Sequence, residues 1–242
     1  MSAPSLVLAP LPEEIWTLRK RLTHVEHLEV PGLQRVWTGW LRGSPVVLAV
    51  TGDGERNARR GVEAALETFD PARLLVIGVA GALTPSLGVG EVIAARRVLE
   101  LGGEPREPSS ELLTRALGLG IPGGTVVTAG KLATTPEAKA RLAARPGVGS
   151  PAVVDLESAF YARAADEAGV PWLVLRAVSD TAGESLPAYL EAYRDTGGAV
   201  RRKLVVFHAL TRPWTIPALV RLARRMSRCS HALADAAFQW RG

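Results

Sequence analysis

The segment between residues 153 and 180 most constrains the fold of this 242-residue chain, because it combines a helix with the strand that follows it. Its first half carries apolar residues at a helical spacing, which predicts a helix with one buried face. These residues are Leu156, Ala159, Phe160, Ala164 and Ala168. Gly169 and then Pro171 mark the end of the helix.

The run from Trp172 to Val178 is almost entirely apolar, which predicts a buried parallel strand. It leads to Ser179 and Asp180 at its carboxyl end, where open α/β sheets bind their ligands. Asp155 and Glu157 stand at the start of the preceding helix. The helix start and the strand end therefore offer carboxylates on the same side of a sheet, an arrangement that core packing alone does not require.

Strands alternate with helices from the N-terminus to Asp180, which predicts one α/β domain with three layers, a central mixed sheet flanked by helices. Small residues at 78–83 predict a tight loop, and glycines and prolines between 102 and 124 predict an irregular surface region. A basic helical tail follows. We therefore expect a domain over residues 1–211 and an amphipathic helical extension over residues 212–242.

The composition excludes several classes of protein. Hydrophobic residues make up 47% of the chain, enough for a sizeable core. A single cysteine, Cys229, excludes an internal disulfide and fits a reducing compartment. The first residues lack the basic segment of a signal peptide, and no stretch approaches the ~20 apolar residues of a membrane span. We expect a cytoplasmic protein.

The net charge of +5 is concentrated at the C-terminal end. Residues 201–242 contain nine Lys or Arg and one acid, whereas residues 1–200 contain 20 Lys or Arg and 23 acids. A nucleic-acid binder more often carries its positive charge on the folded body, so we expect no nucleic acid as a partner. The four histidines and the lone cysteine form no convincing set of metal ligands, so we also expect no metal.

Two further strand-to-helix junctions carry polar groups. Glu14 stands shortly after an expected strand at residues 5–9. The Gly-rich turn at residues 51–57 makes Gly52 and Arg56 candidate anion-binding residues, because backbone N–H groups point outward in such turns. Asn57 occupies the third glycine position of the dinucleotide-binding fingerprint, which argues against a nicotinamide cofactor.

Four segments occur in the order and spacing of a known family. They are A-P-L-P-E-E at 9–14, G-V-A-G-A-L at 78–83, V-D-L-E at 154–157 and R-A-V-S-D at 176–180. Together they resemble the nucleoside phosphorylase and nucleosidase superfamily, which includes methylthioadenosine/S-adenosylhomocysteine nucleosidases. The resemblance covers about residues 5–185. It implies an enzyme, without a cofactor and as a homo-oligomer, that cleaves the N-glycosidic bond of a purine nucleoside.

The resemblance also implies a role for each matching residue. Asp180 corresponds to the general acid that protonates the purine at N7, and Glu157 to the carboxylate that binds the ribose hydroxyls. Glu14 corresponds to the residue that positions or deprotonates the attacking water. The other expected substrate-binding residues are Ala80, Gly81, Thr134, Leu156 and Ser179. An acid and a base on opposite sides of the scissile bond follow the logic of glycosidases.

Alternatives remain open for several of these residues. Asp155 and Glu157 are also suited to capping a helix, and Asp180 to a turn. Glu13 stands beside Glu14 and offers the same carboxylate. Val79 replaces the hydroxyl residue of the family loop, and Val76 replaces the arginine of many phosphorylases. The last substitution favours water over inorganic phosphate as the nucleophile, unless an arginine such as Arg56 binds the anion.

The tail adds a narrower resemblance. L-T-R-P at 210–213 and the run at 216–224 resemble the C-terminal end of hopanoid-associated phosphorylases, which implies adenosylhopane as a substrate. Apolar residues at 222, 226, 229, 233 and 237 predict one apolar helical face, opposite four arginines at 221, 224, 225 and 228. Such a helix packs on the domain or a partner subunit, or binds anionic lipid at a membrane surface. A methylthioadenosine/S-adenosylhomocysteine nucleosidase and a non-catalytic nucleoside-binding protein are the alternative functions.

Overall fold

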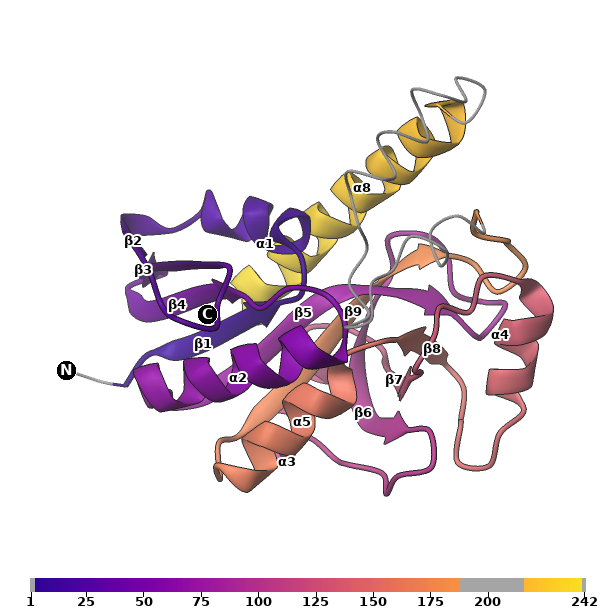
Figure 1. The fold of residues 1–242 in the computed structure, drawn as a ribbon, viewed down its shortest axis with the longest axis horizontal. Helices are drawn as coiled ribbons and strands as arrows, with labels where there is room; N and C mark the ends of the chain where they lie inside the picture. The colour runs from indigo at the N-terminus through magenta and orange to yellow at the C-terminus, as the bar shows by residue number, and fades with distance from the viewer. Residues whose placement is uncertain (1–2, 188–215, 241–242) are drawn as a thin grey trace.

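The structure is a computed structural model that describes residues 3–187 and 216–240 (Figure 1). The described strands are β1 (Ser5–Ala9), β2 (Thr23–Leu28), β3 (Arg35–Leu41), β4 (Ser44–Val50), β5 (Arg73–Ala82), β6 (Val92–Glu100), β7 (Gly123–Thr128), β8 (Ala152–Asp155) and β9 (Trp172–Asp180). The described helices are α1 (Pro12–Arg19), α2 (Glu55–Phe69), α3 (Ser110–Gly118), α4 (Pro136–Ala143), α5 (Ser158–Glu167) and α8 (Ile216–Trp240).

The strands form one mixed sheet in the order β2-β3-β4-β1-β5-β8-β7-β6-β9. β5 lies at its centre and also pairs in parallel with β9, so that β5, β8, β7, β6 and β9 close on one another. Along this pairing Gly78 lies opposite Arg176, and Gly81 lies opposite Asp180. The closure therefore brings the glycine-containing end of β5 against the polar end of β9.

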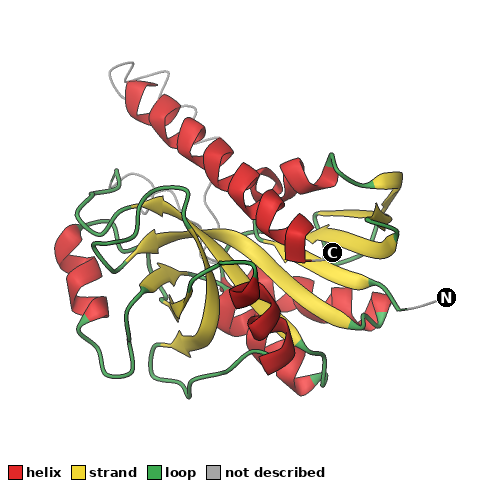
Figure 2. Cartoon of the chain, turned by 180° about the vertical axis from the view of Figure 1, so that it is seen from behind, coloured by secondary structure: helices red, strands yellow, loops and turns green. Residues whose placement is uncertain are grey.

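Helices cover both faces of the sheet, as Figures 1 and 2 show. One core cluster joins β1, β5 and β9 to α2 and α5 through residues such as Val62 and Tyr161. A second cluster joins the opposite face to α1, α3 and α8 through residues such as Ile15, Leu112 and Leu233. The prediction of a three-layer α/β domain with a central mixed sheet is confirmed.

Three local predictions were wrong. The small residues at 78–83, expected as a loop, continue β5 to Ala82, because both edges of that segment find partners in β9 and β8. The region 102–124, expected as irregular, contains α3. Asp155, expected at a helix start, ends the short strand β8, and Glu157 occupies the position that caps α5.

The helix α8 divides into two parts. Its C-terminal part packs against α1 and β9 and buries Cys229, Leu233, Ala237 and Trp240. Its N-terminal part extends away from the body in Figure 1, and there Leu222 and Met226 are only half-buried. The boundary expected between residues 211 and 212, and the segment 210–213, lie outside the described residues. Within the described residues, no helix is both long and apolar enough to cross a membrane.

Candidate active site

Glu14 lies buried in the first turn of α1, at 2% exposure. Its Oε2 accepts a hydrogen bond from Leu11 N (2.8 Å), as the third residue of a helix does in a capping box. Its Oε1 accepts from Val79 N of β5 (2.8 Å). Burial raises the pKa of Glu14 to about 8, although Arg176 and these two N–H groups oppose the shift. The carboxyl group is therefore rigidly held and able to exchange a proton near neutral pH.

Arg176 is fully buried on β9 and faces the same region. Its Nη2 pairs with Asp155 Oδ2 (2.6 Å) and donates to Ser158 Oγ (2.9 Å). Its Nη1 has no hydrogen-bond partner among the described residues. A Cβ on Gly78 would lie 1.8 Å from this Nη1 and 3.2 Å from Glu14 Oε1. Only glycine at position 78 thus leaves space for the guanidinium beside Glu14.

Glu157 completes the group that we call the acid cluster, which consists of Glu14, Asp155, Glu157 and Arg176. Its Oε1 accepts from Gly54 N in the Gly-rich turn (2.9 Å). Burial first, and then Asp155, raise the pKa of Glu157 to about 7, against the opposing effect of Arg176. Three buried carboxyl groups share a single guanidinium, so the acid cluster holds more acidic groups than its one cation can neutralise.

Asp155 has a structural role within this cluster. Its carboxylate accepts from Ser158 N (3.1 Å) and from Thr128 Oγ1 (2.8 Å). From the end of β8, Asp155 thus binds the first N–H of α5, and the ion pair with Arg176 is a second contact of the same carboxylate.

Asp180 ends β9 and is also buried, at 2% exposure. Its Oδ2 accepts from Lys139 Nζ (2.5 Å), and its Oδ1 lies 2.6 Å from Ser179 Oγ. We call Lys139 and Asp180 the lysine–aspartate pair. A Cβ on Gly81 would lie 3.0 Å from Asp180 Oδ2, so the carboxyl group passes close to the backbone of β5.

The acid cluster and the lysine–aspartate pair lie at the same end of β5. Glu14 contacts β5 at Val79, and Asp180 contacts it at Gly81. Two residues along a strand span roughly 7 Å. Glu157 lies near the same region, because its partner Gly54 belongs to the turn whose Gly52 N donates to Pro10 O, next to Leu11. The three carboxyl groups are therefore held by backbone segments that lie near this end of β5.

The remaining predicted residues lie around this region. The Ala80 carbonyl accepts from Ser179 Oγ (3.2 Å), and the Thr134 carbonyl accepts from Leu186 N (2.8 Å), near the turn that follows Asp180. Leu156 is half-buried between β8 and α5. Gly52 N already donates to Pro10 O (3.0 Å), so this N–H is not available to an anion, and Arg56 is exposed on α2.

Sequence reasoning missed two residues of this site. Arg176 is a charged residue within the otherwise apolar run of β9, and a buried arginine needs an acidic partner and is therefore a signal of a site. Lys139 gave no such signal. Thr135 and Pro136 mark the start of α4, but only the tertiary structure shows that its lysine reaches Asp180.

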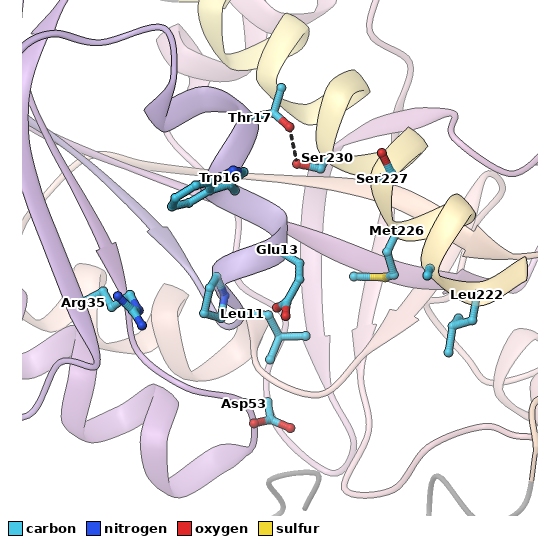
Figure 3. A pocket seen from close by; sticks show the side chains of 12 residues that line it. Leu11, Glu13, Trp16, Thr17, Arg35, Asp53, Leu222, Met226, Ser227 and Ser230 are labelled. Atoms are coloured by element: carbon cyan, nitrogen blue, oxygen red, sulfur yellow. Dashed lines mark hydrogen bonds between the residues drawn. The ribbon is translucent and has the colours of Figure 1, made fainter. Parts of the chain in front are cut away.

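A groove of about 880 Å³ lies between α1 and α8 (Figure 3). Trp16 of α1 and Leu222 and Met226 of α8 provide its apolar walls. Leu11, whose N–H binds Glu14, and Asp53, next to the glycine that binds Glu157, also line it. The groove therefore comes close to the backbone that holds the two glutamates.

Among residues 3–187 and 216–240, no three His, Cys, Asp or Glu side chains form a group that could hold a metal ion. The described polar groups are instead arranged as carboxyl groups with cationic partners. The chemistry that they can perform is proton transfer and charge stabilisation on an organic ligand.

The chain is similar in sequence and in fold to several known proteins. The 5'-methylthioadenosine/S-adenosylhomocysteine nucleosidase of Geobacillus thermodenitrificans is 27% identical over 223 residues, which cover 83% of this chain and 93% of that protein. The nucleosidase of Neisseria meningitidis in complex with methylthio-immucillin-A superposes with a TM-score of 0.77 at 18% identity, over 99% and 98% of the two chains. Futalosine hydrolase of Helicobacter pylori gives a TM-score of 0.76 at 16% identity, over 98% and 97% of the two chains.

The family model of the phosphorylase superfamily matches residues 4–207. This range contains every residue of the acid cluster and of the lysine–aspartate pair. The match extends over most of the chain, which therefore belongs to the phosphorylase superfamily.

Proposed function

We propose that this enzyme cleaves the N-glycosidic bond of a purine nucleoside, with adenine as the base. The observation that carries the proposal is the burial of Glu14, Glu157 and Asp180 around one end of β5. Related nucleosidases with 25–27% identity over most of the chain support the same reaction class.

The chemistry assigns one carboxyl group to each part of the substrate. Asp180 donates a proton to N7 of the purine, so that the C1'–N9 electron pair leaves with a neutral base. Glu157 accepts hydrogen bonds from the ribose hydroxyls. Glu14 takes a proton from the attacking water, and the unpartnered Nη1 of Arg176 beside it is a donor for the same water.

Water and inorganic phosphate remain the two candidate nucleophiles. The raised pKa of Glu14 favours water, because a buried glutamate with a pKa of about 8 is a competent base but repels an anion once it is ionised. Adenine release should therefore be equally fast with and without phosphate. A rate that depends on phosphate would assign the reaction to a phosphorylase.

The substituent at the ribose 5' position distinguishes the substrates within this class. We propose a long apolar substituent, such as the hopane side chain of adenosylhopane, because the groove between α1 and α8 has apolar walls and is also lined by Leu11, whose N–H binds Glu14. A methylthioadenosine/S-adenosylhomocysteine nucleosidase is the second candidate, which the curated relatives favour.

The test compares adenine release from adenosine, 5'-methylthioadenosine and a long-chain 5'-alkyl adenosine. A higher kcat/KM for the long-chain substrate supports the lipid-linked nucleoside. Ala223→Trp, which fills the groove, should then lower kcat/KM for that substrate alone, and adenosine serves as the internal control. A preference for 5'-methylthioadenosine contradicts the lipid-linked substrate, and adenine release from none of the three contradicts the enzymatic function.

We also propose that the exposed N-terminal part of α8 contacts anionic lipid. Arg221 and Arg224 are exposed there, and each basic residue near such a surface contributes about 1 kcal/mol. The double variant R221Q/R224Q should sediment less with vesicles of anionic lipid. The charge-matched control R141Q/R145Q changes two exposed arginines near the end of α4 and should sediment like the wild type. Equal sedimentation of R221Q/R224Q and R141Q/R145Q would contradict this proposal.

A homo-oligomer is the expected assembly, on the basis of the family resemblance. Light scattering at several protein concentrations measures it directly. A monomer at all concentrations would contradict the expectation without affecting the proposed chemistry.

A further inference from the structure

Lys139 is a buried cation that has no part in the reaction steps proposed above. It lies on α4 with 1% of its side chain exposed. Its Nζ contacts Asp180 Oδ2 (2.5 Å), the Thr181 carbonyl oxygen (2.6 Å) and the Glu184 carbonyl oxygen (3.0 Å). An ammonium group has three N–H donors, so all of them are used. The position of Nζ relative to Asp180 is therefore determined from three directions.

The turn that provides two of these acceptors is itself held in place. Glu184 N donates to Thr181 O (3.1 Å), and Thr181 N donates to Glu184 Oε2 (2.9 Å). These bonds close residues 181–184 into a compact turn directly after Asp180. Lys139 thus binds the turn and the carboxyl group of Asp180 at the same time.

Arg225 connects this turn to helix α8. Its Nη2 lies 2.6 Å from Glu184 Oε1, and its Nη1 lies 3.0 Å from Glu184 Oε2, a two-point contact with fixed geometry. Hydrogen bonding by Arg225 lowers the pKa of Glu184 to about 2, so the pair is charged at neutral pH. Arg225 was expected on the basic face of the tail helix, and there it forms an ion pair with the turn that follows β9.

We propose that Lys139 is a positioning residue for the leaving-group acid Asp180, and that the Arg225–Glu184 pair holds the turn on which Lys139 depends. The proposal rests on the proposed function of Asp180. Proton transfer to a purine requires the carboxyl group within about 2.6–3.2 Å of the accepting nitrogen, so a small displacement is sufficient to slow it. Asp180 is a carboxylate in its ion pair with Lys139, so it must take up a proton from solvent as the nucleoside binds. Once that proton has moved to N7, the ammonium group stabilises the carboxylate that remains.

The test measures adenine release by Lys139→Met, Asp180→Asn and the double variant K139M/D180N. Lys139→Met should lower kcat by about 10²-fold and leave KM within about threefold of the wild type, because it impairs proton transfer and spares ribose binding. If Lys139 acts through Asp180, the double variant should be no slower than D180N by more than about threefold. A merely structural lysine would instead give a loss that multiplies with that of D180N, which would overturn the proposal.

Arg225→Gln keeps the test decisive if Lys139→Met fails to fold, because Arg225 is only partly buried. It should lower kcat by about tenfold at an unchanged thermal unfolding midpoint. Arg141→Gln, on the exposed face of α4, is the matched control and should keep the wild-type kcat. A kcat for Arg225→Gln equal to that of the control would also overturn the proposal. Absence of adenine release by the wild type would instead contradict the proposed function itself.

Discussion

The acid cluster and the lysine–aspartate pair lie at the same end of β5 but balance their charges in different ways. In the acid cluster, three carboxyl groups share Arg176, one guanidinium N–H lacks a partner among the described residues, and the pKa values of Glu14 and Glu157 are raised. In the lysine–aspartate pair, one carboxylate meets one ammonium whose three donors are all used.

The two regions therefore have different roles. The carboxyl groups of the acid cluster have raised pKa values and change protonation state near neutral pH. A ligand can supply the hydrogen-bond acceptor that the Nη1 of Arg176 lacks. Groups whose hydrogen bonds are already complete hold a fixed geometry before the ligand arrives. We infer that the acid cluster binds and activates, and that the lysine–aspartate pair presents an acid in a preset position.

The largest effect is expected for Asp180→Asn, which removes the proposed acid and keeps its shape. The kcat for adenine release should fall by about 10²–10⁴-fold, because the departing purine is no longer protonated. A riboside of 4-nitrophenol, whose leaving group needs no proton, should lose far less activity with this variant. Equal losses of kcat on the purine nucleoside and on the 4-nitrophenyl riboside would show that Asp180 binds substrate without acting as an acid. The proposed difference in role between the acid cluster and the lysine–aspartate pair would then be wrong.

Glu14→Gln tests the acid cluster and should lower kcat by about 10²-fold. The pH dependence of kcat/KM for the wild-type enzyme provides a second test. Because Glu14 must be ionised to accept a proton and its pKa is about 8, kcat/KM should rise with pH until about pH 8. The pH–rate profile measures this directly. A profile without a rise between pH 6 and 8 would exclude Glu14 as the base.

Gly78→Ala perturbs the acid cluster through its packing. The new Cβ would lie 1.8 Å from Arg176 Nη1, so the guanidinium must move away from Glu14. We expect a loss of about 2 kcal/mol in the free energy of unfolding, measured by denaturant titration, together with reduced activity. Gly118→Ala, in α3 and with open space around its Cβ, is the control and should change stability by less than about 1 kcal/mol. Similar values for both variants would contradict the described position of Arg176.

The smallest effect, per pH unit, is expected in the pH dependence of stability. The pKa of Glu14 is higher in the folded protein than its ordinary value of 4.5, so the folded state binds more protons between these two values. Stability should therefore fall as pH rises from about 5 to 8, by about 1 kcal/mol per pH unit from this group. Thermal unfolding of Glu14→Gln at several pH values should lack this contribution. An identical slope for the variant would assign the dependence to other groups, Glu157 first.

The sequence predicted the parts of the site that local patterns mark. The apolar run of β9 and the helical spacing of α5 predicted where Asp180 and Glu157 would stand, and the strand expected at residues 5–9 predicted a strand-to-helix junction near Glu14. The same patterns wrongly predicted a loop at 78–83, because a row of small residues is typical of a loop when the neighbouring strands are unknown. Here the partners are the buried Arg176 and Asp180, whose side chains occupy the space that larger residues would fill.

By itself, the sequence determined the α/β architecture and the carboxylates at the ends of its elements, because hydrophobic period and strand-end position are local properties of the chain. Only the tertiary structure decided which cation meets which carboxylate. Lys139 and Asp180 are 41 residues apart, and Arg225 and Glu184 are separated by the same distance along the chain. Such pairs depend on how the sheet closes and where α8 packs, and the spacing of residues in a sequence does not encode either contact.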